Sequence, residues 1–262
     1  MNKHKIGGMM MDDYNQKWMY DGYYYRELNQ SVRPSIVVSK HGDVTGDGVV
    51  DLVYLTAIKT PDSPFWRNIT LVIINGRTQK QTHIQLKNNQ GYNPTLFLGD
   101  VTGNKVNDIL IISDTGGSGG AINAAVYSYI NGRFQEIFND SSFQSAFTYD
   151  VAYEQHYKAS VISHKVNEKF VIDLTYKGQQ YLSEIYTRDG KLIEPITGWV
   201  NPLSGLYPID FNRDGTYELE AYQRIAGRYN ADSLGYVQTV LRWNGSQFVP
   251  ERQYVAIYGG EG

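Results

Sequence analysis

An acidic nine-residue segment occurs three times in this chain of 262 residues. The copies read DVTGDGVVD at 43–51, DVTGNKVND at 100–108 and DFNRDGTYE at 210–218. Each copy places oxygen-bearing side chains at its first, third, fifth and ninth positions, and two copies have glycine at the sixth. Alternating oxygen ligands around a glycine that permits a sharp bend are typical of calcium loops. The segment therefore constrains the fold through its spacing and the site through its chemistry.

The spacing of the three segments indicates a repeated unit. Their first residues lie 57 residues apart (43 to 100) and then 110 apart (100 to 210), and the second interval is close to twice the first. A regular array with one interval doubled is most simply explained by a unit that has lost its segment. We therefore expect a degenerate repeat between the second and third copies.

A second marker gives the same period independently. Asn-Gly or Asp-Gly pairs, which favour the positive backbone angles of tight hairpin turns, recur at intervals of 56, 58 and 55 residues, at 75–76, 131–132, 189–190 and 244–245. Apolar or alternating residues flank each pair. The markers predict four repeats, at about 34–91, 92–143, 144–200 and 201–262.

The third repeat has the hairpin marker but no good acidic segment. Its best alignment keeps Asp150 and Glu154 at the four-residue spacing and ends in Lys158, whose charge could replace that of an ion. We expect no metal in this repeat.

Strand patterns predominate in every repeat, and no helix-length amphipathic pattern stands out. Four-stranded units at this period favour an all-β fold, a β-propeller of four blades within a single domain at 34–262. A propeller of five blades is the main alternative, and an open stack of sheets is less favoured because its terminal edges would be exposed. We expect residues 1–33 to be partly flexible and to help close the propeller.

Composition excludes several classes of protein and site. The chain has no cysteine, which excludes disulfides, thiolate zinc sites and cysteine nucleophiles. The net charge is −3 and lysine and arginine form no cluster, so no nucleic-acid partner is expected. No apolar run approaches the ~18 residues of a membrane span, so no membrane insertion is expected. The N-terminus lacks the apolar run of a signal peptide.

The predicted metal ligands follow from position within each segment, and oxygen-only donors favour calcium over zinc or copper. We predict two or three Ca²⁺ ions, bound most tightly by the first segment and least tightly by the second, where Asn104 replaces an aspartate and Lys105 replaces glycine. The ligands, taking backbone carbonyls at Val49, Val106 and Thr216, are Asp43, Thr45, Asp47, Val49 and Asp51; Asp100, Thr102, Asn104, Val106 and Asp108; and Asp210, Asn212, Asp214, Thr216 and Glu218.

Other candidate sites are weaker. The five histidines show no metal-ligand spacing, and His41 is interpreted as a strand-end residue. Glycines at 116–120 lack the lysine and helix of a phosphate loop, which favours a flexible turn between strands. Ser118 has no assignable catalytic partner. The chain contains 22 tyrosines. We interpret the aromatic residues of the strands mainly as packing between sheets, whereas the aromatic cluster at 18–25 is equally consistent with packing and with ligand recognition.

The three acidic segments, each followed by an apolar strand, resemble the FG-GAP or VCBS repeat family, whose members form calcium-binding propellers. The resemblance covers about 34–258. The chain as a whole also resembles small VCBS-type proteins of spore-forming bacilli. It implies a non-enzymatic structural or interaction protein of the spore coat, assembled from the cytoplasm, with other coat proteins as partners. A purely cytoplasmic protein is the alternative location. The alternative function is a propeller that binds or cleaves polysaccharide, with a glycan as partner.

Overall fold

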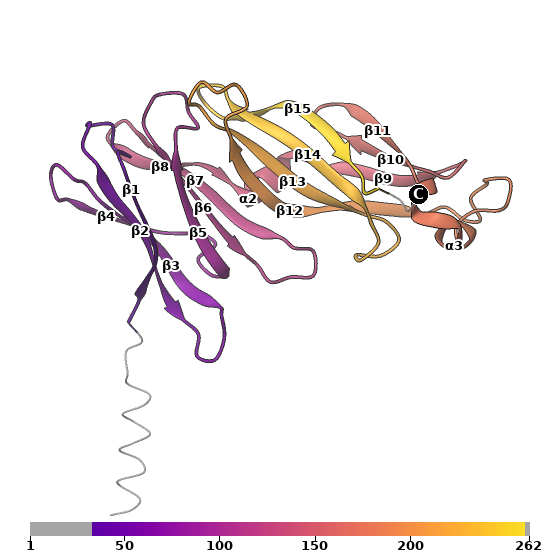
Figure 1. The fold of residues 1–262 in the computed structure, drawn as a ribbon, viewed down its shortest axis with the longest axis horizontal. Coiled ribbons are helices and arrows are strands. Elements are labelled where there is room, and N and C mark those ends of the chain that lie inside the picture. The colour runs from indigo at the N-terminus through magenta and orange to yellow at the C-terminus, as the bar shows by residue number, and fades with distance from the viewer. Residues whose placement is uncertain (1–32, 260–262) are drawn as a thin grey trace, which may run out of the picture. The chain divides into compact units, whose positions relative to one another are not determined.

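Antiparallel strands arranged in three sheets make up the structure (Figure 1). The computed structural model describes residues 33–259, and the chain from Ser35 onward forms one compact unit. The strands agree with the all-β part of the prediction. Residues 1–33 were predicted to help close the propeller. All of them except residue 33 lie outside the described part of the chain.

The first and second sheets are four-stranded meanders in which each strand pairs with the next in sequence. The first comprises β1 (Ser35–Gly42), β2 (Asp51–Lys59), β3 (Trp66–Ile74) and β4 (Gln81–Gln85). The second comprises β5 (Tyr92–Gly99), β6 (Asp108–Asp114), β7 (Ile122–Ile130) and β8 (Arg133–Asn139). They fall within the first two expected repeats.

The third sheet has seven strands in the order β11-β10-β9-β12-β13-β14-β15. Its strands are β9 (Tyr149–Glu154), β10 (Lys158–Ser163), β11 (Glu168–Asp173), β12 (Thr197–Ile209), β13 (Glu218–Ala226), β14 (Ser233–Trp243) and β15 (Phe248–Ala256). Thr197 and Gly198 of β12 pair with Ala152 and Val151 of β9. The third and fourth repeats therefore share one sheet.

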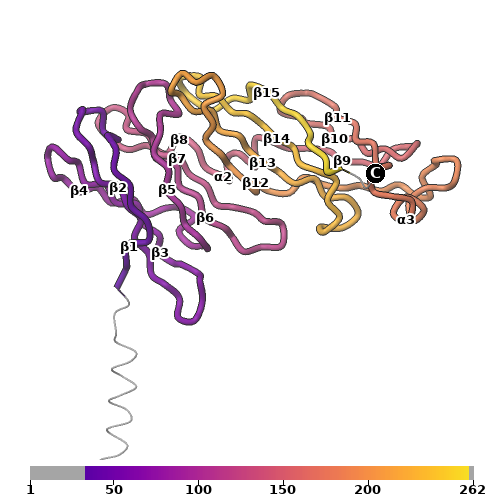
Figure 2. The backbone as a smooth tube through the Cα atoms, in the orientation of Figure 1, coloured from indigo at the N-terminus to yellow at the C-terminus, as the bar shows by residue number. Residues whose placement is uncertain are grey.

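Short helices connect these strand sets. Figure 2 follows the backbone from β8 through α2 (Asp140–Ala146) into β9. Asn139 caps this helix, because its side chain accepts a hydrogen bond from the Ser142 N–H at 2.8 Å. The 3₁₀ helix η1 (Thr175–Lys177) and α3 (Gly178–Ser183) lie between β11 and β12.

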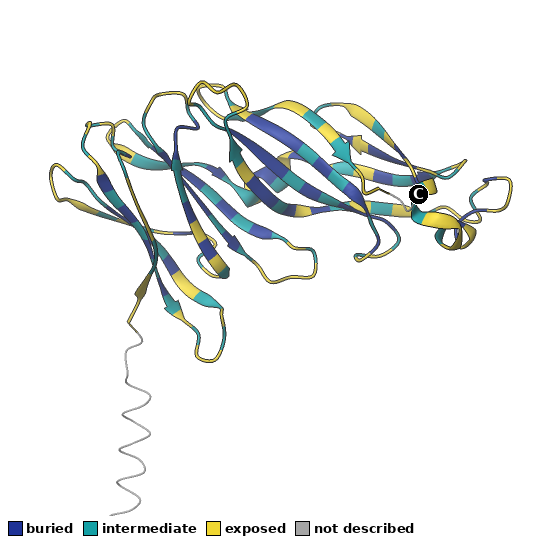
Figure 3. Ribbon diagram, viewed as in Figure 1, coloured by how far each residue is buried: buried dark blue, intermediate teal, exposed yellow. Residues whose placement is uncertain are grey.

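The period-two alternation of the strands builds the cores between successive sheets. In β2, Val53, Leu55 and Ala57 are fully buried while the residues between them are partly exposed (Figure 3). This buried row belongs to a core shared with Ile109 and Ile111 of β6. The first sheet therefore packs face to face on the second.

The second sheet is buried on both faces. Ile109 and Ile111 of β6 belong to the core with the first sheet, whereas Leu110 belongs to a different core with Leu206 of β12 and Leu219 of β13. A strand buried on both faces reads as a continuous apolar run, as ILII at 109–112 does. Sheet two thus lies between sheet one and the β12–β15 part of the third sheet.

The predicted propeller, with four or five blades, is wrong. Propeller blades are separate sheets arranged radially, whereas β9 and β12 here join two repeats edge to edge in one sheet. The sheets formed by repeats one, two and four instead follow one another face to face. The third repeat pairs with the edge of the last of them and also shares a core with it, in which Val161 of β10 and Ile172 of β11 are clustered with Val237 of β14. The markers matched four-stranded sets in repeats one and two, but in the third repeat Asp189-Gly190 follows α3 and is flanked only by the isolated bridge between Tyr186 and Leu192.

The predicted degenerate loop of the third repeat is also absent from the structure. Asp150 and Glu154 lie on β9, and Lys158 begins β10. Asp150 pairs with His164 at 3.1 Å, and Glu154 pairs with Lys169 at 2.5 Å. The four-residue spacing in this repeat comes from a hairpin and does not form a bent loop.

Candidate functional site

The three acidic segments occupy equivalent places in the fold. They form the β1–β2, β5–β6 and β12–β13 connections, so each joins the first two strands of its unit. We call them loop one (43–51), loop two (100–108) and loop three (210–218). The fourth and sixth positions of each loop have positive φ, at Gly46 and Gly48, Gly103 and Lys105, and Arg213 and Gly215. The loops therefore share one backbone conformation.

The first-position aspartate organises each bend. Asp43 accepts a hydrogen bond from the N–H of Gly48 at 2.8 Å, and Asp100 accepts the equivalent bond from Lys105 at 2.6 Å. Asp210 accepts it from Gly215 at 3.0 Å. Lys105 adopts a φ of 66° where the other loops have glycine, and a left-handed backbone strains an ordinary residue. Arg213 of loop three likewise adopts a φ of 60° where the other loops have glycine, so loops two and three each hold one ordinary residue in this region.

The fifth and ninth positions repeat the same pattern. Each fifth-position side chain accepts a bond from the N–H two residues later, at 2.9 Å for Asp47, 2.8 Å for Asn104 and 2.8 Å for Asp214. Each ninth-position carboxylate accepts a bond from the N–H of the second position, at 2.9 Å for Asp51, 2.9 Å for Asp108 and 3.3 Å for Glu218.

The third-position side chains also turn toward the ninth-position carboxylates. Thr45 and Thr102 donate their hydroxyls to Asp51 and Asp108, each at 3.1 Å. Asn212 makes the corresponding contact with Glu218 at 3.5 Å. The polar residues that sequence selected as ligands are therefore brought together loop by loop, largely as acceptors for N–H and O–H groups of the same loop.

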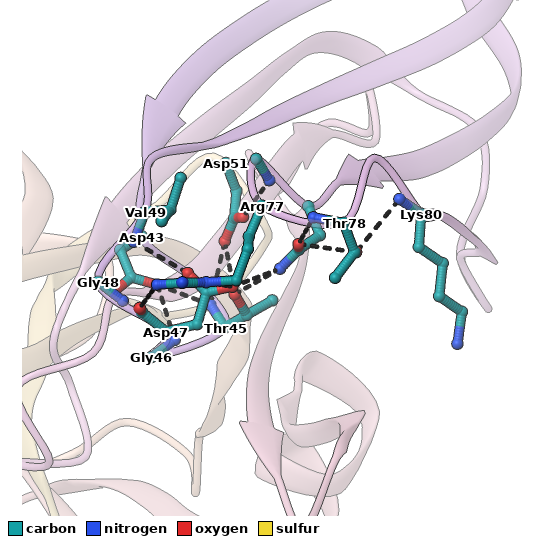
Figure 4. A network of polar contacts seen from close by, with 12 residues as sticks. Asp43, Thr45, Gly46, Asp47, Gly48, Val49, Asp51, Arg77, Thr78 and Lys80 are labelled. Atoms are coloured by element: carbon teal, nitrogen blue, oxygen red, sulfur yellow. Dashed lines mark hydrogen bonds and ion pairs between the residues drawn. The ribbon is translucent and has the colours of Figure 1, made fainter.

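Loop one is also hydrogen-bonded to the Asn75-Gly76 pair of the same repeat, at the start of the β3–β4 connection (Figure 4). Asn75 donates its side-chain amide to Thr45 Oγ1 at 2.9 Å and to Asp47 at 3.1 Å, and the Gly76 N–H donates to Asp51 Oδ1 at 2.9 Å. The Asn75 and Val49 hydrogen bonds, with the charge of Arg77, hold the pKa of Asp47 below its usual range. These contacts reach loop one because the β3–β4 connection spans residues 75–80.

The corresponding contact is missing in loop two. In the second sheet Ile130 pairs directly with Arg133, so Asn131 and Gly132 form a two-residue turn. Asp108 Oδ1 is buried without a hydrogen-bond partner. Burial raises the pKa of Asp108, although the nearby Ser128 hydroxyl and the Val101 N–H act in the opposite direction. Ser128 Oγ likewise has no partner in hydrogen-bond geometry, so the two atoms face each other without a well-formed bond.

Backbone hydrogen bonds connect successive loops. The Asn107 N–H donates to the carbonyl of Asp43 at 3.1 Å, and the Tyr217 N–H donates to the carbonyl of Asp100 at 2.7 Å. In both cases the eighth residue of one loop binds the first residue of the preceding loop. We call this row the loop seam. It runs from sheet one through sheet two to β12–β13, and it does not include the third repeat.

The donor set of the loops suits calcium chemically, since it consists of carboxylates, hydroxyls and carbonyls. As arranged, however, Asp51 uses both oxygens for N–H and O–H donors, and Asp47 lies 3.5 Å from the Arg77 guanidinium. Within residues 33–259, no three side chains of His, Cys, Asp or Glu converge in a way that could hold a metal ion. Calcium binding by the loops therefore stays a prediction.

Sequence reasoning missed a buried polar cluster that joins the third repeat to the fourth. Asp232, whose side chain is 1% exposed, accepts hydrogen bonds from Lys177 at 2.8 Å and from the hydroxyls of Tyr181 at 2.8 Å and Tyr153 at 3.1 Å. The Arg228 N–H adds a bond at 3.0 Å. These residues come from β9, η1, α3 and the β13–β14 connection. Their separation along the chain left no local motif to find.

The charge state of this cluster follows from its contacts. Desolvation by burial favours the neutral form of Asp232, but the hydrogen bonds from Lys177 and Tyr181 outweigh it and keep the pKa of Asp232 below its usual range. Burial raises the pKa of both Tyr153 and Tyr181, and Asp232 raises them further. The cluster is thus one carboxylate surrounded by donors.

The remaining sequence candidates lie as follows. His41 is the penultimate residue of β1, as its interpretation as a strand-end residue predicted. Glycines 116–120, with Ser118, lie in the connection between β6 and β7. Tyr127 is buried in the core between sheets one and two, where it packs as predicted. No helix in the described part of the chain is long and apolar enough to cross a membrane.

Comparison with known proteins identifies the family of this chain. The chain is 59% identical over 251 residues to the uncharacterized protein YybI of Bacillus subtilis (strain 168), an alignment that covers 93% of this chain and 95% of the relative. The chain belongs to the YybI family. Residues 147–256 match the family model described as the YybI C-terminal domain, a range that contains the whole seven-stranded sheet. The YybI family is therefore supported, and these matches give no support to the FG-GAP or VCBS resemblance. No solved structure matches the chain.

Proposed function

We propose that this YybI-family protein is a non-enzymatic structural or interaction protein. The observation that supports the proposal is the loop seam, in which the most acidic segments of the chain hydrogen-bond to themselves and to one another. Asp43 and Asp100 accept bonds from their own loops through their carboxylates and from the next loop through their carbonyls. The carboxylates hold each loop in shape and the carbonyls join one loop to the next, an arrangement suited to a rigid scaffold.

The stacking also suits a scaffold because every internal sheet face is buried. Sheet two contributes Ile109 and Leu110 to different cores, so displacement of either neighbour would expose apolar surface. Two cores and three hydrogen bonds between loops, one of them from the Asn107 side chain to the Asp43 carbonyl, thus resist the same movement. A protein built in this way presents fixed surfaces to partners.

We further propose the spore coat as its location, with other coat proteins as partners and assembly from the cytoplasm. This rests on the resemblance to small proteins of spore-forming bacilli. A fluorescent fusion of the whole chain, followed through sporulation, tests it. The expected result is signal that gathers around the forming spore, while the fluorescent protein alone stays diffuse. Signal from the fusion that stays diffuse throughout would contradict the location.

Calcium belongs to the proposal as a stabilising ion, to be tested separately from location. Asp43, Asp47 and Asp51 would supply the carboxylates in loop one, with Asp47 exchanging its contact with Arg77 for the ion. When bound, calcium would neutralise carboxylates that otherwise repel one another. The predicted order of affinity remains loop one, then loop three, then loop two.

A further inference from the structure

Four tyrosines form a continuous row on one face of the seven-stranded sheet. Tyr207 on β12, Tyr222 on β13, Tyr236 on β14 and Tyr258 beyond β15 have successive ring-centroid distances of 5.3, 6.2 and 6.2 Å. Adjacent rings are inclined by 87°, 65° and 72°. The row is on the face opposite the core, because Ala221 and Val237, the neighbours of Tyr222 and Tyr236 along the strands, are fully buried. We call it the tyrosine row.

The two ends of the tyrosine row are open to solvent. Tyr207 is 53% exposed and Tyr258 is 51% exposed. A Cβ on Gly205 would approach Cε2 of the Tyr207 ring to 2.8 Å, so this ring lies over the β12 backbone where no side chain intervenes. The Cε2, Cζ and hydroxyl end of the Tyr207 ring is thereby placed against the backbone, and half of the residue remains open to solvent.

Hydrogen-bonding groups are interspersed with the rings. Glu220 is 6% exposed and accepts bonds from the hydroxyls of Tyr222, at 3.2 Å, and Tyr254. Arg224 lies opposite Tyr236, and its Nε is buried without a partner. Gln238 lies between Tyr222 and Tyr254 in the register of β13, β14 and β15. The face thus combines aromatic surface with fixed donors and acceptors, one of which is unused.

We infer that the tyrosine row binds an extended polysaccharide, an inference that rests on the proposed interaction role. Sugar rings combine apolar C–H faces, which stack on aromatic rings, with hydroxyls that both donate and accept. The carboxylate of Glu220 is held by two tyrosine hydroxyls, and Arg224 beside Tyr236 donates to Asn230 at 2.9 Å. The rings succeed one another in a line across β12, β13, β14 and the segment that follows β15, which fits a chain of repeating units.

A protein partner fits this face less well. Protein interfaces that bind tightly have a dry central patch in which aromatic anchors fill pockets of the partner. Here the two central rings are half-buried within their own sheet, and the two exposed rings stand at opposite ends of the row. An extended ligand that contacts the row along its length uses both ends at once.

Sedimentation of the whole chain with microcrystalline cellulose and with chitin tests this inference. We expect the protein to pellet with at least one of them, and Tyr207→Ala to weaken binding about tenfold because a stacking face is removed. Tyr207→Phe, which keeps the ring, should bind as the parent does. Tyr229→Ala is the matched control, because Tyr229 is 56% exposed and lies outside the row. Circular dichroism establishes that each variant is folded, and Tyr258→Ala, near the chain end, gives a second reduction.

The outcomes separate this inference from the proposed function. No retention on either polysaccharide, or equal retention of Tyr207→Ala and Tyr258→Ala with the parent, would overturn polysaccharide binding. A protein that gathers at the spore but is not retained leaves the interaction role intact and overturns this inference alone. A protein that is retained, yet stays diffuse during sporulation, supports this inference and contradicts the coat location.

Discussion

The stacked repeats and the third repeat are held to the rest of the molecule by different means. Repeats one, two and four form separate faces that pack on one another and carry the loop seam. Repeat three joins the sheet of repeat four through β9 and β12, shares a core with β13 and β14, and has no acidic loop. In place of a loop it has the Asp232 cluster, which fastens η1 and α3 to the β13–β14 connection. The acidic loop thus accompanies stacking, and a repeat that leaves the stack has no neighbour for the loop to bind.

The Asp232 cluster gives the largest expected effect on the third repeat. Asp232→Asn removes the buried carboxylate from Lys177, whose side chain is 18% exposed, and breaking such a pair destabilises by up to about 3–5 kcal/mol. Chemical denaturation of the parent and variant measures this loss. Asp189→Asn, which affects the exposed pair with Lys191, should change stability by less than about 1 kcal/mol. Similar effects of the two substitutions would contradict a buried role for Asp232.

The same cluster predicts a dependence of stability on pH. Because the folded pKa of Asp232 is lowered, its contribution is complete above the unfolded value of about 3.9 and is lost as pH falls through the folded value. Denaturation curves measured from about pH 6 downward should therefore converge for the parent and Asp232→Asn. A constant difference between them at all pH values would show that the carboxylate charge is not what stabilises the cluster.

Calcium distinguishes the stacked repeats from the third one, if the loops bind it. At a free concentration of 100 times the dissociation constant, one bound ion raises the free energy of unfolding by about 2.7 kcal/mol. Calcium titration followed by thermal unfolding measures this effect. Asp43→Ala should remove the tightest site and Asp100→Ala the weakest. Loss of the tightest site in Asp100→Ala, with Asp43→Ala unchanged, would reverse the predicted order.

Within the stack, loops one and two can be compared at their ninth position. Asp51 takes N–H donors on both oxygens, so Asp51→Asn sets an amide against the Gly76 N–H and should destabilise by about 1–3 kcal/mol. Asp108 has one oxygen unused beside Ser128, so Asp108→Asn can donate to that hydroxyl and should change stability by less than about 0.5 kcal/mol. Urea denaturation of both variants without calcium checks this, and equal losses would contradict the difference between the loops.

The smallest expected effect concerns the loop seam. Gly46 and Gly48 both have positive φ, so alanine at either strains the backbone by about 1 kcal/mol. A Cβ at Gly46 would also meet Val106 of loop two at 2.9 Å, whereas one at Gly48 meets nothing within 4 Å. Gly46→Ala should therefore destabilise more than Gly48→Ala by a further amount of up to about 1 kcal/mol. Thermal unfolding of the two variants would show equal losses if the loops did not touch.

Much of the strand content was predictable because it is encoded locally. Alternation in β2 and the apolar run of β6 state which faces are buried, and Asn131-Gly132 forms the two-residue turn that its backbone preferences favour. The loops could also be predicted from sequence. Their shape depends on hydrogen bonds that Asp43, Asp47 and Asp51 accept within one nine-residue segment. The same spacing gave a wrong prediction of a degenerate loop at Asp150, because spacing alone does not distinguish a bent loop from a strand.

The contacts of the loops could not be predicted in the same way. Whether a ninth-position carboxylate is saturated depends on a hairpin about 25 residues away, as the Gly76 bond to Asp51 shows. The Asp232 cluster joins residues up to 79 positions apart, and neither Tyr153 nor Tyr181 carries a local sign of its partner. Such contacts depend on how the elements pack.

The sequence by itself determined that the chain is built from β-strands and contains three acidic loops of one conformation, because hydrogen bonds and side-chain alternation act over a few residues. Only the tertiary structure decided that the repeats stack in succession and do not close into a propeller. Whether a strand set packs by its face or pairs by its edge depends on the free energy of burying surfaces far apart in the chain. That choice placed β9 beside β12 and brought four tyrosines into one row.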